Sequence, residues 1–301
     1  MVSTFFEILG ATFRISTPLI FSASGNLISE RAGILNLGIE GTMYVGAFVG
    51  IAVAAASGSL WVGLAAAIAS GIVAGLIMSF LSVTLGVNQH VAGLGITLAL
   101  IAMSNTANRI LFTEDGGQLR VEPWSPILTD LGPPFEQYWL TYAAFLLVLP
   151  AVWLLLNRTG LGLKIRAVGE NPEAADAAGV RVSLIRYAAV TSGAALMAVG
   201  GAFITLAFLG SFTIDIIAGR GWVALALVIF GRWRVGGMLI GALVFSFVYA
   251  LQNRLRLIPE FAEIPYEILL ALPYVAVIIG LMITGRKMRY PGAYLKSYRR
   301  S

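Results

Sequence analysis

The chain has 301 residues, of which 58% are hydrophobic and only 12% are charged. Soluble globular proteins carry about 25% charged residues, so this composition excludes an ordinary soluble domain. The net charge of +5 does not imply a nucleic-acid partner, and with no cysteine and one histidine we expect no disulfide, no metal site and no bound cofactor.

Continuous apolar runs predict an all-α polytopic membrane protein that forms a single domain over residues 1–301. A bilayer requires roughly 17–25 apolar residues per helix. We expect about nine membrane segments, with a range of eight to ten and with some of them broken. The predicted segments are residues 5–28, 33–56, 60–85, 91–112, 139–156, 187–209, 222–230, 238–251 and 268–283.

The start of the second run carries polar side chains. Residues 28–48 read ISERAGILNLGIEGTMYVGAF, which places Asn36 and Glu40 among closely spaced glycines. A carboxylate near the bilayer centre costs about 2.5–3.5 kcal/mol on insertion scales, so we expect Glu40 to face protein or a water-filled path. The alternative is a structural role, in which Glu40 reaches the interface or pairs with Arg31.

A second polar group, Asn88-Gln89-His90, precedes the fourth run, and Asn105 lies further along that run. Uncharged amides suit contacts with a neutral polar solute. Turn formation, helix capping and helix–helix hydrogen bonding are the alternative roles. The candidate residues of a translocation path are Asn36, Glu40, Asn88 and Asn105.

The polar segment 157–186, NRTGLGLKIRAVGENPEAADAAGVRVSLIR, predicts a short exposed helix between two membrane runs. Asn171 is a good N-cap, Pro172 suits the first helical position, and Glu173 favours the positive end of the helix. Gly179 stands where a left-handed residue would end the helix. A capped helix of about two turns between membrane segments suggests a docking element for a soluble partner.

The segment 210–237 is irregular, because glycines interrupt it and its apolar run, 222–230, is too short to cross a bilayer. Gly-interrupted apolar segments in both halves of a chain are a sequence indicator of a transporter's pathway. Residues 29–46 form the corresponding segment of the first half. We interpret Asp215 and Arg220 as an ion pair of an outer loop.

The distribution of Lys and Arg predicts the orientation, since cytoplasmic loops are enriched in basic residues. Segment 157–186 and the tail are therefore placed in the cytoplasm. If the runs alternate across the bilayer, the inside segments hold fourteen basic residues and the outside segments hold four. Segment 113–138 and the N-terminus are then outside, and the C-terminus is cytoplasmic.

Glu173-Ala174-Ala175, three residues and then Gly179 resemble the cytoplasmic EAA loop of ABC-importer permeases, although the Leu-Pro pair that often follows is missing. Other blocks resemble the ribose-permease-like permeases for nucleosides and simple sugars. The block GVNQHVAGLGITLAL is similar to nucleoside permeases in particular. These blocks are distributed along the chain, at residues 28–48, 86–100, 158–180 and 219–243.

This resemblance implies the permease subunit of an ABC importer in the bacterial cytoplasmic (inner) membrane. The implied partners are an ATP-binding subunit, a second permease that is homologous or identical, an extracytoplasmic substrate-binding protein and the lipid bilayer. The partner ATPase uses the ATP, because this chain has no GxxxxGK[ST] phosphate-binding loop. The implied coupling residues are Asn171, Pro172, Glu173, Ala174, Ala175, Asp176 and Gly179.

The sequence favours a nucleoside as the solute, with a simple-sugar or a branched-chain amino-acid ABC permease as the alternative. Outside this superfamily, an ion-coupled secondary transporter would use Glu40 as its proton or sodium site. An enzyme is not expected, because His, Asp, Glu and Ser do not cluster as a catalytic site requires.

Overall fold

The computed structural model describes residues 2–112, 119–256, 265–285, 290–296 and 298. Over these residues the regular structure is helical, and the β-contacts are two isolated bridges. Within the described ranges, six helical segments are long and apolar enough to cross a membrane, judged by length and composition. They are Ile39–Ser57 (α2), Leu60–Thr84 (α3 and the π-helix η1), Gln89–Phe112 (α4), Trp139–Arg158 (α5, the π-helix η3, and α6), Val182–Leu209 (α9 and the π-helix η4) and Val235–Leu255 (α11).

Three further helices complete the bundle. α1 (Val2–Arg31) is long but more polar, α10 (Arg220–Phe230) is short, and α12 (Tyr266–Gly285) has a shorter apolar core. The all-helical polytopic fold predicted from the sequence is confirmed. The number of membrane segments is not, because six helices meet the criteria where about nine segments are expected.

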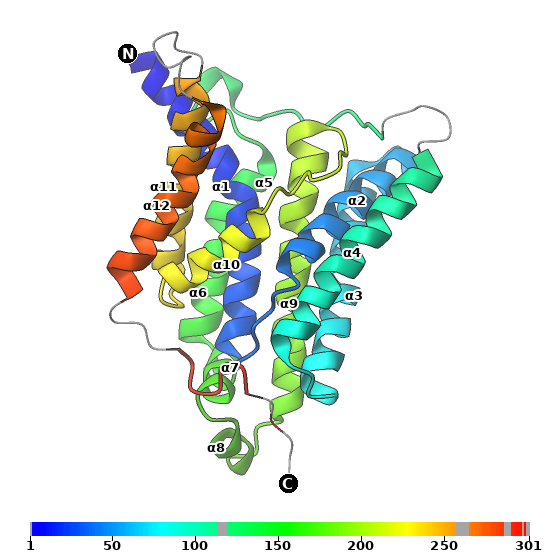
Figure 1. Ribbon diagram of the computed structural model, residues 1–301, viewed down its shortest axis with the longest axis vertical. Helices are drawn as coiled ribbons and strands as arrows, with labels where there is room; N and C mark the ends of the chain where they lie inside the picture. Colours follow the sequence, from blue (N-terminus) through cyan, green and yellow to red (C-terminus); the bar gives the residue numbers. More distant parts are fainter. Residues whose placement is uncertain (1, 113–118, 257–264, 286–289, 297, 299–301) are drawn as a thin grey trace.

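α1 lies in the centre of the bundle, where it packs against α9, α10 and α11 (Figure 1). Every residue from Ser16 to Glu30 is buried. A helix that faces other helices need not be apolar, which explains how α1 holds several polar side chains. Pro18 lies inside this helix and does not interrupt it.

The predicted runs match the helices closely, with one exception. The sequence predicts a second helix from Gly33, whereas α2 begins at Ile39. Residues 32–38 form an irregular linker that rises inside the bundle from the end of α1 (Figure 1). Gly33 has φ +83°, which turns the chain directly after α1. The linker is apolar because it is buried, and its composition therefore resembles that of a helix.

α10 crosses the middle of the bundle obliquely and contacts α1, α2, α11 and α12 (Figure 1). Its 11 residues extend about 16 Å, roughly half the apolar thickness of a bilayer. The segment before it, 210–219, is not helical. The irregular, interrupted segment expected at 210–237 is therefore present.

The two ends of the bundle differ. The start of α1 and the segment 119–138, which contains the 3-10 turn η2 (Thr129–Leu131), lie at one end, and α7 (Gly160–Glu170) and α8 (Pro172–Ala177) lie at the other (Figure 1). At the first end the rings of Trp61, Trp124 and Trp139 are in mutual contact, with centroids 4.7–5.3 Å apart. Tryptophan clusters of this kind are typical of a membrane interface.

Candidate coupling helix and solute path

α8 is capped at its N-terminus as the sequence predicts. The Asn171 Oδ1 accepts a hydrogen bond from the Ala174 N–H at 3.0 Å, and Pro172 occupies the first helical position. Glu173 lies in the first turn, where a carboxylate stabilises the positive end of the helix.

The C-terminus of α8 is closed by paired backbone bonds. The Gly179 N–H donates to the Asp176 carbonyl at 2.8 Å, and the Val180 N–H donates to the Ala175 carbonyl at 3.0 Å. This pairing is the Schellman motif, which requires a left-handed residue after the helix. Gly179 provides it with φ +82°. Caps at both ends make α8 a rigid element despite its six residues.

The exposed face of α8 consists of Glu173, Ala174, Ala177 and Ala178. Ala175 is buried against the chain itself, so it supports the helix from within and is not available to a partner. A surface of small side chains with one carboxylate is therefore what α8 presents to its surroundings.

α7 precedes α8 and was not predicted from the sequence. The Thr159 hydroxyl caps it by accepting a hydrogen bond from the Gly162 N–H at 3.0 Å. Thr159 was the available signal, but three glycines within the helix obscured it, since glycine is a poor helix former. α7 packs against α1, α6 and α9 as well as α8, and it thereby connects α8 to the membrane helices.

Glu40 is buried and caps α10. Its Oε1 accepts from the Gly219 N–H at 2.8 Å, and its Oε2 accepts from the Gly221 N–H at 2.7 Å. The first N–H groups of a helix lack partners within the helix and carry partial positive charge, so a carboxylate there stabilises the helix end. Glu40 does not pair with Arg31, whose guanidinium donates to the Trp233 carbonyl.

The other three candidate path residues lie in separate places. Asn36 is buried and accepts a hydrogen bond from the backbone two residues further on. Asn88 is exposed and accepts one from the His90 N–H at the start of α4. Asn105 accepts one from the Tyr44 hydroxyl. Asn36 and Asn88 serve local bonds, whereas the bond of Asn105 joins α4 to α2. None of the four candidates lines the cavity described next.

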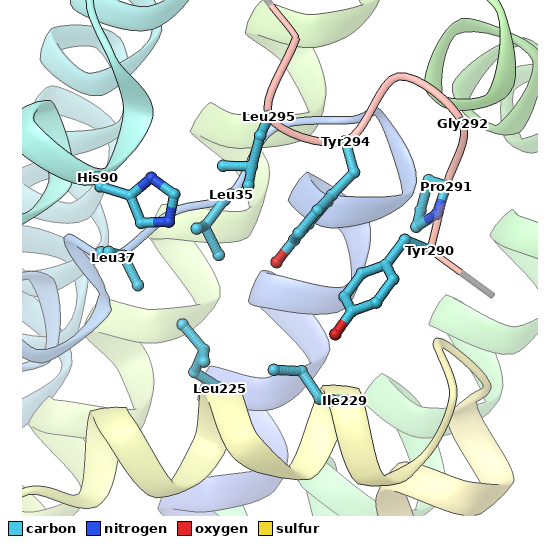
Figure 2. Close-up of a pocket in the computed structure, with 10 residues that line it drawn as sticks. All are labelled: Leu35, Leu37, His90, Leu225, Ile229, Tyr290, Pro291, Gly292, Tyr294 and Leu295. Carbon is cyan, nitrogen blue, oxygen red and sulfur yellow. The ribbon is translucent and has the colours of Figure 1, made fainter. Parts of the chain in front are cut away.

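The α10 chamber, a cavity of about 700 Å³, lies between α10, the 32–38 linker, the start of α4 and the segment 290–295 (Figure 2). Leu35 and Leu37 flank Asn36 in sequence, and His90 shares its turn with Asn88. The sequence therefore indicated the right turns, but the neighbouring side chains are the ones that face the cavity. The lining residues are Leu35, Leu37, His90, Leu225, Ile229, Tyr290, Pro291, Gly292, Tyr294 and Leu295.

A buried hydrogen-bond cluster joins α1 to the turn between α10 and α11, and it was also not predicted. The Trp233 Nε1–H donates to the Glu30 Oε2, and the Asn26 Nδ2–H donates to the Glu30 Oε1 at 2.7 Å. The Arg31 Nε–H donates to the Trp233 carbonyl at 2.9 Å. Glu30 and Arg31 therefore hold this turn in place.

Asp215 and Arg220 are not joined as the outer-loop ion pair that the sequence suggests. The Arg220 Nη1 donates to the carbonyls of Ile216 at 2.9 Å and Ile217 at 3.1 Å. The guanidinium therefore closes the loop that leads into α10.

Comparison with known proteins gives the family. Residues 8–285 match the family described as the permease component of the branched-chain amino acid transport system. The chain belongs to this permease family. No solved structure matches the chain.

Three curated relatives match most of the permease. A putative glucose ABC transporter permease of Haloferax volcanii is 38% identical over 82% of this chain and 77% of its own. A nucleoside ABC transporter permease of Lactococcus lactis is 32% identical over 99% of both chains. A guanosine ABC transporter permease of Bacillus subtilis is 32% identical over 91% of this chain and 90% of its own.

The protein is therefore an ABC transporter permease and a multi-pass membrane protein. The family resemblance predicted from the sequence is confirmed, and the ABC class is favoured over an ion-coupled secondary transporter. The three relatives are described as permeases of ABC transporters.

Proposed function

We propose that this permease forms the membrane path of an importer for nucleosides, driven by a partner ATPase. Support for the solute comes from the nucleoside and guanosine permeases, which match this chain over at least 90% of its length. The observation that carries the ATP-driven mechanism is α8, an exposed helix that is capped at both ends and packed through α7 onto the membrane helices. Such a helix transmits a displacement instead of bending.

In this proposal α8 docks the ATP-binding subunit on the cytoplasmic side. The C-terminus lies on that side, and the start of α1 and the segment 119–138 lie outside. α1, α10 and α12 then complete about nine membrane segments, with α10 crossing only half of the bilayer. A second permease, identical or homologous, lies beside this one, and an extracytoplasmic binding protein delivers the solute. The ATPase holds the ATP, and this chain contributes no catalytic, metal or cofactor site.

The proposed path runs past the N-terminus of α10 into the α10 chamber. Glu40 fixes the start of α10, and Asn36 shapes the linker that forms one wall. We assign Asn88, which caps the start of α4, and Asn105, which accepts a hydrogen bond from Tyr44 of α2, to the same path. Apolar and aromatic walls with a few polar groups are typical of sites for small organic ligands.

The chamber wall disfavours an amino acid as the solute. Its ten lining residues include no Asp, Glu, Lys or Arg. The ammonium and carboxylate of an amino acid would lose hydration there without gaining an opposite charge. A glucose-type sugar is the second candidate, because the relative with 38% identity is a putative glucose permease.

The solute is tested by uptake of radiolabelled guanosine in cells that express the complete transporter. We expect unlabelled nucleosides to suppress the uptake and equal concentrations of glucose or leucine to leave it unchanged. Guanosine uptake no higher than in cells without the permease, together with glucose uptake above that background, would replace the nucleoside assignment by the sugar one.

The coupling role is tested by Gly179→Val and Glu173→Lys. A valine at φ +82° costs about 1 kcal/mol or more and disrupts the C-terminal turn of α8. The lysine places a positive charge at the positive end of the helix. We expect both variants to insert in the membrane, to lose copurifying ATPase and to lose uptake.

The matched controls are Gly160→Val, at a position where an added Cβ meets no atom within 4 Å, and Glu173→Gln, which keeps the size of the side chain. Both controls should retain the ATPase. Full retention of the ATPase and normal uptake in Gly179→Val and Glu173→Lys would contradict the coupling assignment.

A further inference from the structure

Residues 290–296 and Tyr298, defined here as the strap, lie across the end of the bundle that carries α7 and α8 (Figure 1). Tyr290, Pro291, Gly292, Tyr294 and Leu295 supply half of the ten residues that line the α10 chamber. Figure 2 shows the side chains of Tyr290 and Tyr294 pointing from the strap toward α10. The strap is therefore one wall of the chamber, on the side opposite α10.

Three hydrogen bonds attach the strap to the two loop helices. The Ala293 N–H donates to the Gly169 carbonyl at 2.8 Å, and the Gly292 N–H donates to the Glu170 Oε2 at 3.2 Å. The Tyr298 hydroxyl donates to the Asp176 Oδ2 of α8 at 3.1 Å. The strap is thus bonded to the helix that carries the proposed ATPase contact and to the helix before it.

The strap is also seated on the membrane helices. The rings of Tyr290 and Tyr294 pack against Trp233, with centroids 5.0 and 5.9 Å away. Burial raises the pKa of the Tyr294 phenol, which therefore stays protonated and forms a hydrogen bond with Glu30. At the far end of the strap, the buried Arg186 Nη1 donates to the Lys296 carbonyl at 3.3 Å.

We propose that the strap is the gate of the α10 chamber, and that movement of α7 and α8 draws it away from α10 to release solute on the α7–α8 side. This inference rests on the proposed function, because it assigns the driving movement to the docked ATPase. The chamber is lined by leucines, an isoleucine, two tyrosines and a histidine. It suits an uncharged solute with a flat ring, which the tyrosine side chains can contact.

Two sets of contacts hold the strap, and they belong to different parts of the bundle. When α7 and α8 are at rest, their three hydrogen bonds and the contacts with Trp233 hold the strap in the same place. When α8 is displaced, both sets cannot be kept, because one set moves with the loop helices and the other stays with α1 and α10. Two discrete arrangements of this kind are what a gate requires.

Gly292→Val tests the gate without altering a membrane helix. A Cβ added at Gly292 would lie 2.5 Å from the Glu170 carbonyl oxygen, so the strap must shift away from α7. The reporter is Leu225→Cys, on the α10 wall of a chain that has no other cysteine. Inverted membrane vesicles that contain the complete transporter are treated with an impermeant maleimide from the cytoplasmic face.

We expect Gly292→Val to raise the labelling rate of the reporter at least about tenfold, since accessibility follows the population of the open state. The matched control is Gly160→Val on the same reporter background, which should label like the parent. Equal rates in the two variants would overturn the gate.

A second measurement does not depend on displacing the strap by mutation. His90→Cys and Leu295→Cys place thiols on two sides of the chamber, and a reducible bis-maleimide can join them. We expect uptake to stop in the bridged transporter and to return when the bridge is reduced, with both single-cysteine variants active throughout. Undiminished uptake in the bridged transporter would show that the strap does not move.

Different measurements test the gate and the coupling role of α8, so either proposal can be contradicted without the other. If Gly179→Val retains its ATPase and its uptake, the coupling assignment fails whatever the labelling shows. If that variant loses its ATPase while Gly292→Val labels like its control, the coupling assignment stands and the strap is a static wall.

Discussion

At the scale of single residues, two ionisable side chains inside the bundle form hydrogen bonds with backbone groups. Glu40 accepts from two N–H groups at the start of α10, and Arg31 donates to the Trp233 carbonyl. Both are buried or half-buried between helices. A membrane offers no water to replace such bonds, so each broken helix needs a side chain to complete its ends.

Substitution of Glu40 should therefore affect stability and transport together. Glu40→Gln keeps one acceptor oxygen but turns an amide N–H₂ toward a backbone N–H. Glu40→Leu leaves the half-buried Gly219 N–H and the buried Gly221 N–H without their acceptor, and the buried one costs about 1–3 kcal/mol. We expect the melting temperature in detergent to fall slightly for Gln and strongly for Leu, and uptake to fall in the same order.

Glu122→Leu is the control, because Glu122 is exposed in the segment 119–138 and its loss should leave both measurements unchanged. Wild-type uptake and melting in Glu40→Leu would show that the cap contributes nothing to α10.

Local features were predictable at this scale and long-range ones were not. Asn171 and Gly179 act within a few residues of themselves, and both caps of α8 follow the sequence. The α10 chamber is built from four separate segments, so no single stretch could reveal that Leu35 and not Asn36 faces it. A polar residue in an apolar run indicates a buried partner, but it does not identify the partner.

At the scale of elements, the apolar runs predicted the membrane helices because length and hydropathy suffice for that purpose. The same rule failed for the 32–38 linker, which is apolar because helices surround it. It also missed α7, whose glycines allow close packing: a Cβ at Gly162 would lie 1.9 Å from the Leu155 carbonyl oxygen of α6. Tight contacts between helices thus require glycines, and because glycine has a low helix propensity, the sequence does not predict the helix.

The strap is even harder to predict from local sequence than α7. Its sequence, YPGAYLK, shows no helix or strand pattern, and only the basic residues of the tail contributed to a prediction, that of the orientation. Its ordered contacts arise only when α7, Trp233 and Arg186 converge at one end of the bundle. An irregular segment that is held by distant elements carries no periodic pattern in its own sequence, so its position cannot be predicted from that sequence.

At the scale of the whole molecule, the two ends of the bundle are chemically distinct. One end carries the tryptophan cluster and the ion pair between Arg254 and Glu7, whose side chains are 3.3 Å apart. The other end carries α7, α8 and the strap (Figure 1). Fourteen basic residues fall in segments assigned to this second end or its tail, and four fall in segments assigned to the first. The positive-inside rule therefore predicts an orientation with α8 in the cytoplasm.

Cysteine labelling in this cysteine-free chain tests that orientation directly. Asp130 lies in η2 and Lys164 lies in α7, and both side chains are exposed at opposite ends of the bundle. We expect Asp130→Cys to react with an impermeant maleimide in cells whose inner membrane is intact and whose outer face the reagent can reach. Lys164→Cys should react only after the inner membrane is opened or inverted. The physical reason is the cost of moving the basic α7–α8 loop across the bilayer. Labelling of both cysteines from the same face would contradict the prediction that the two ends of the bundle lie on opposite sides of the membrane. The reverse pattern would place α8 outside the cell, where no ATPase could bind it.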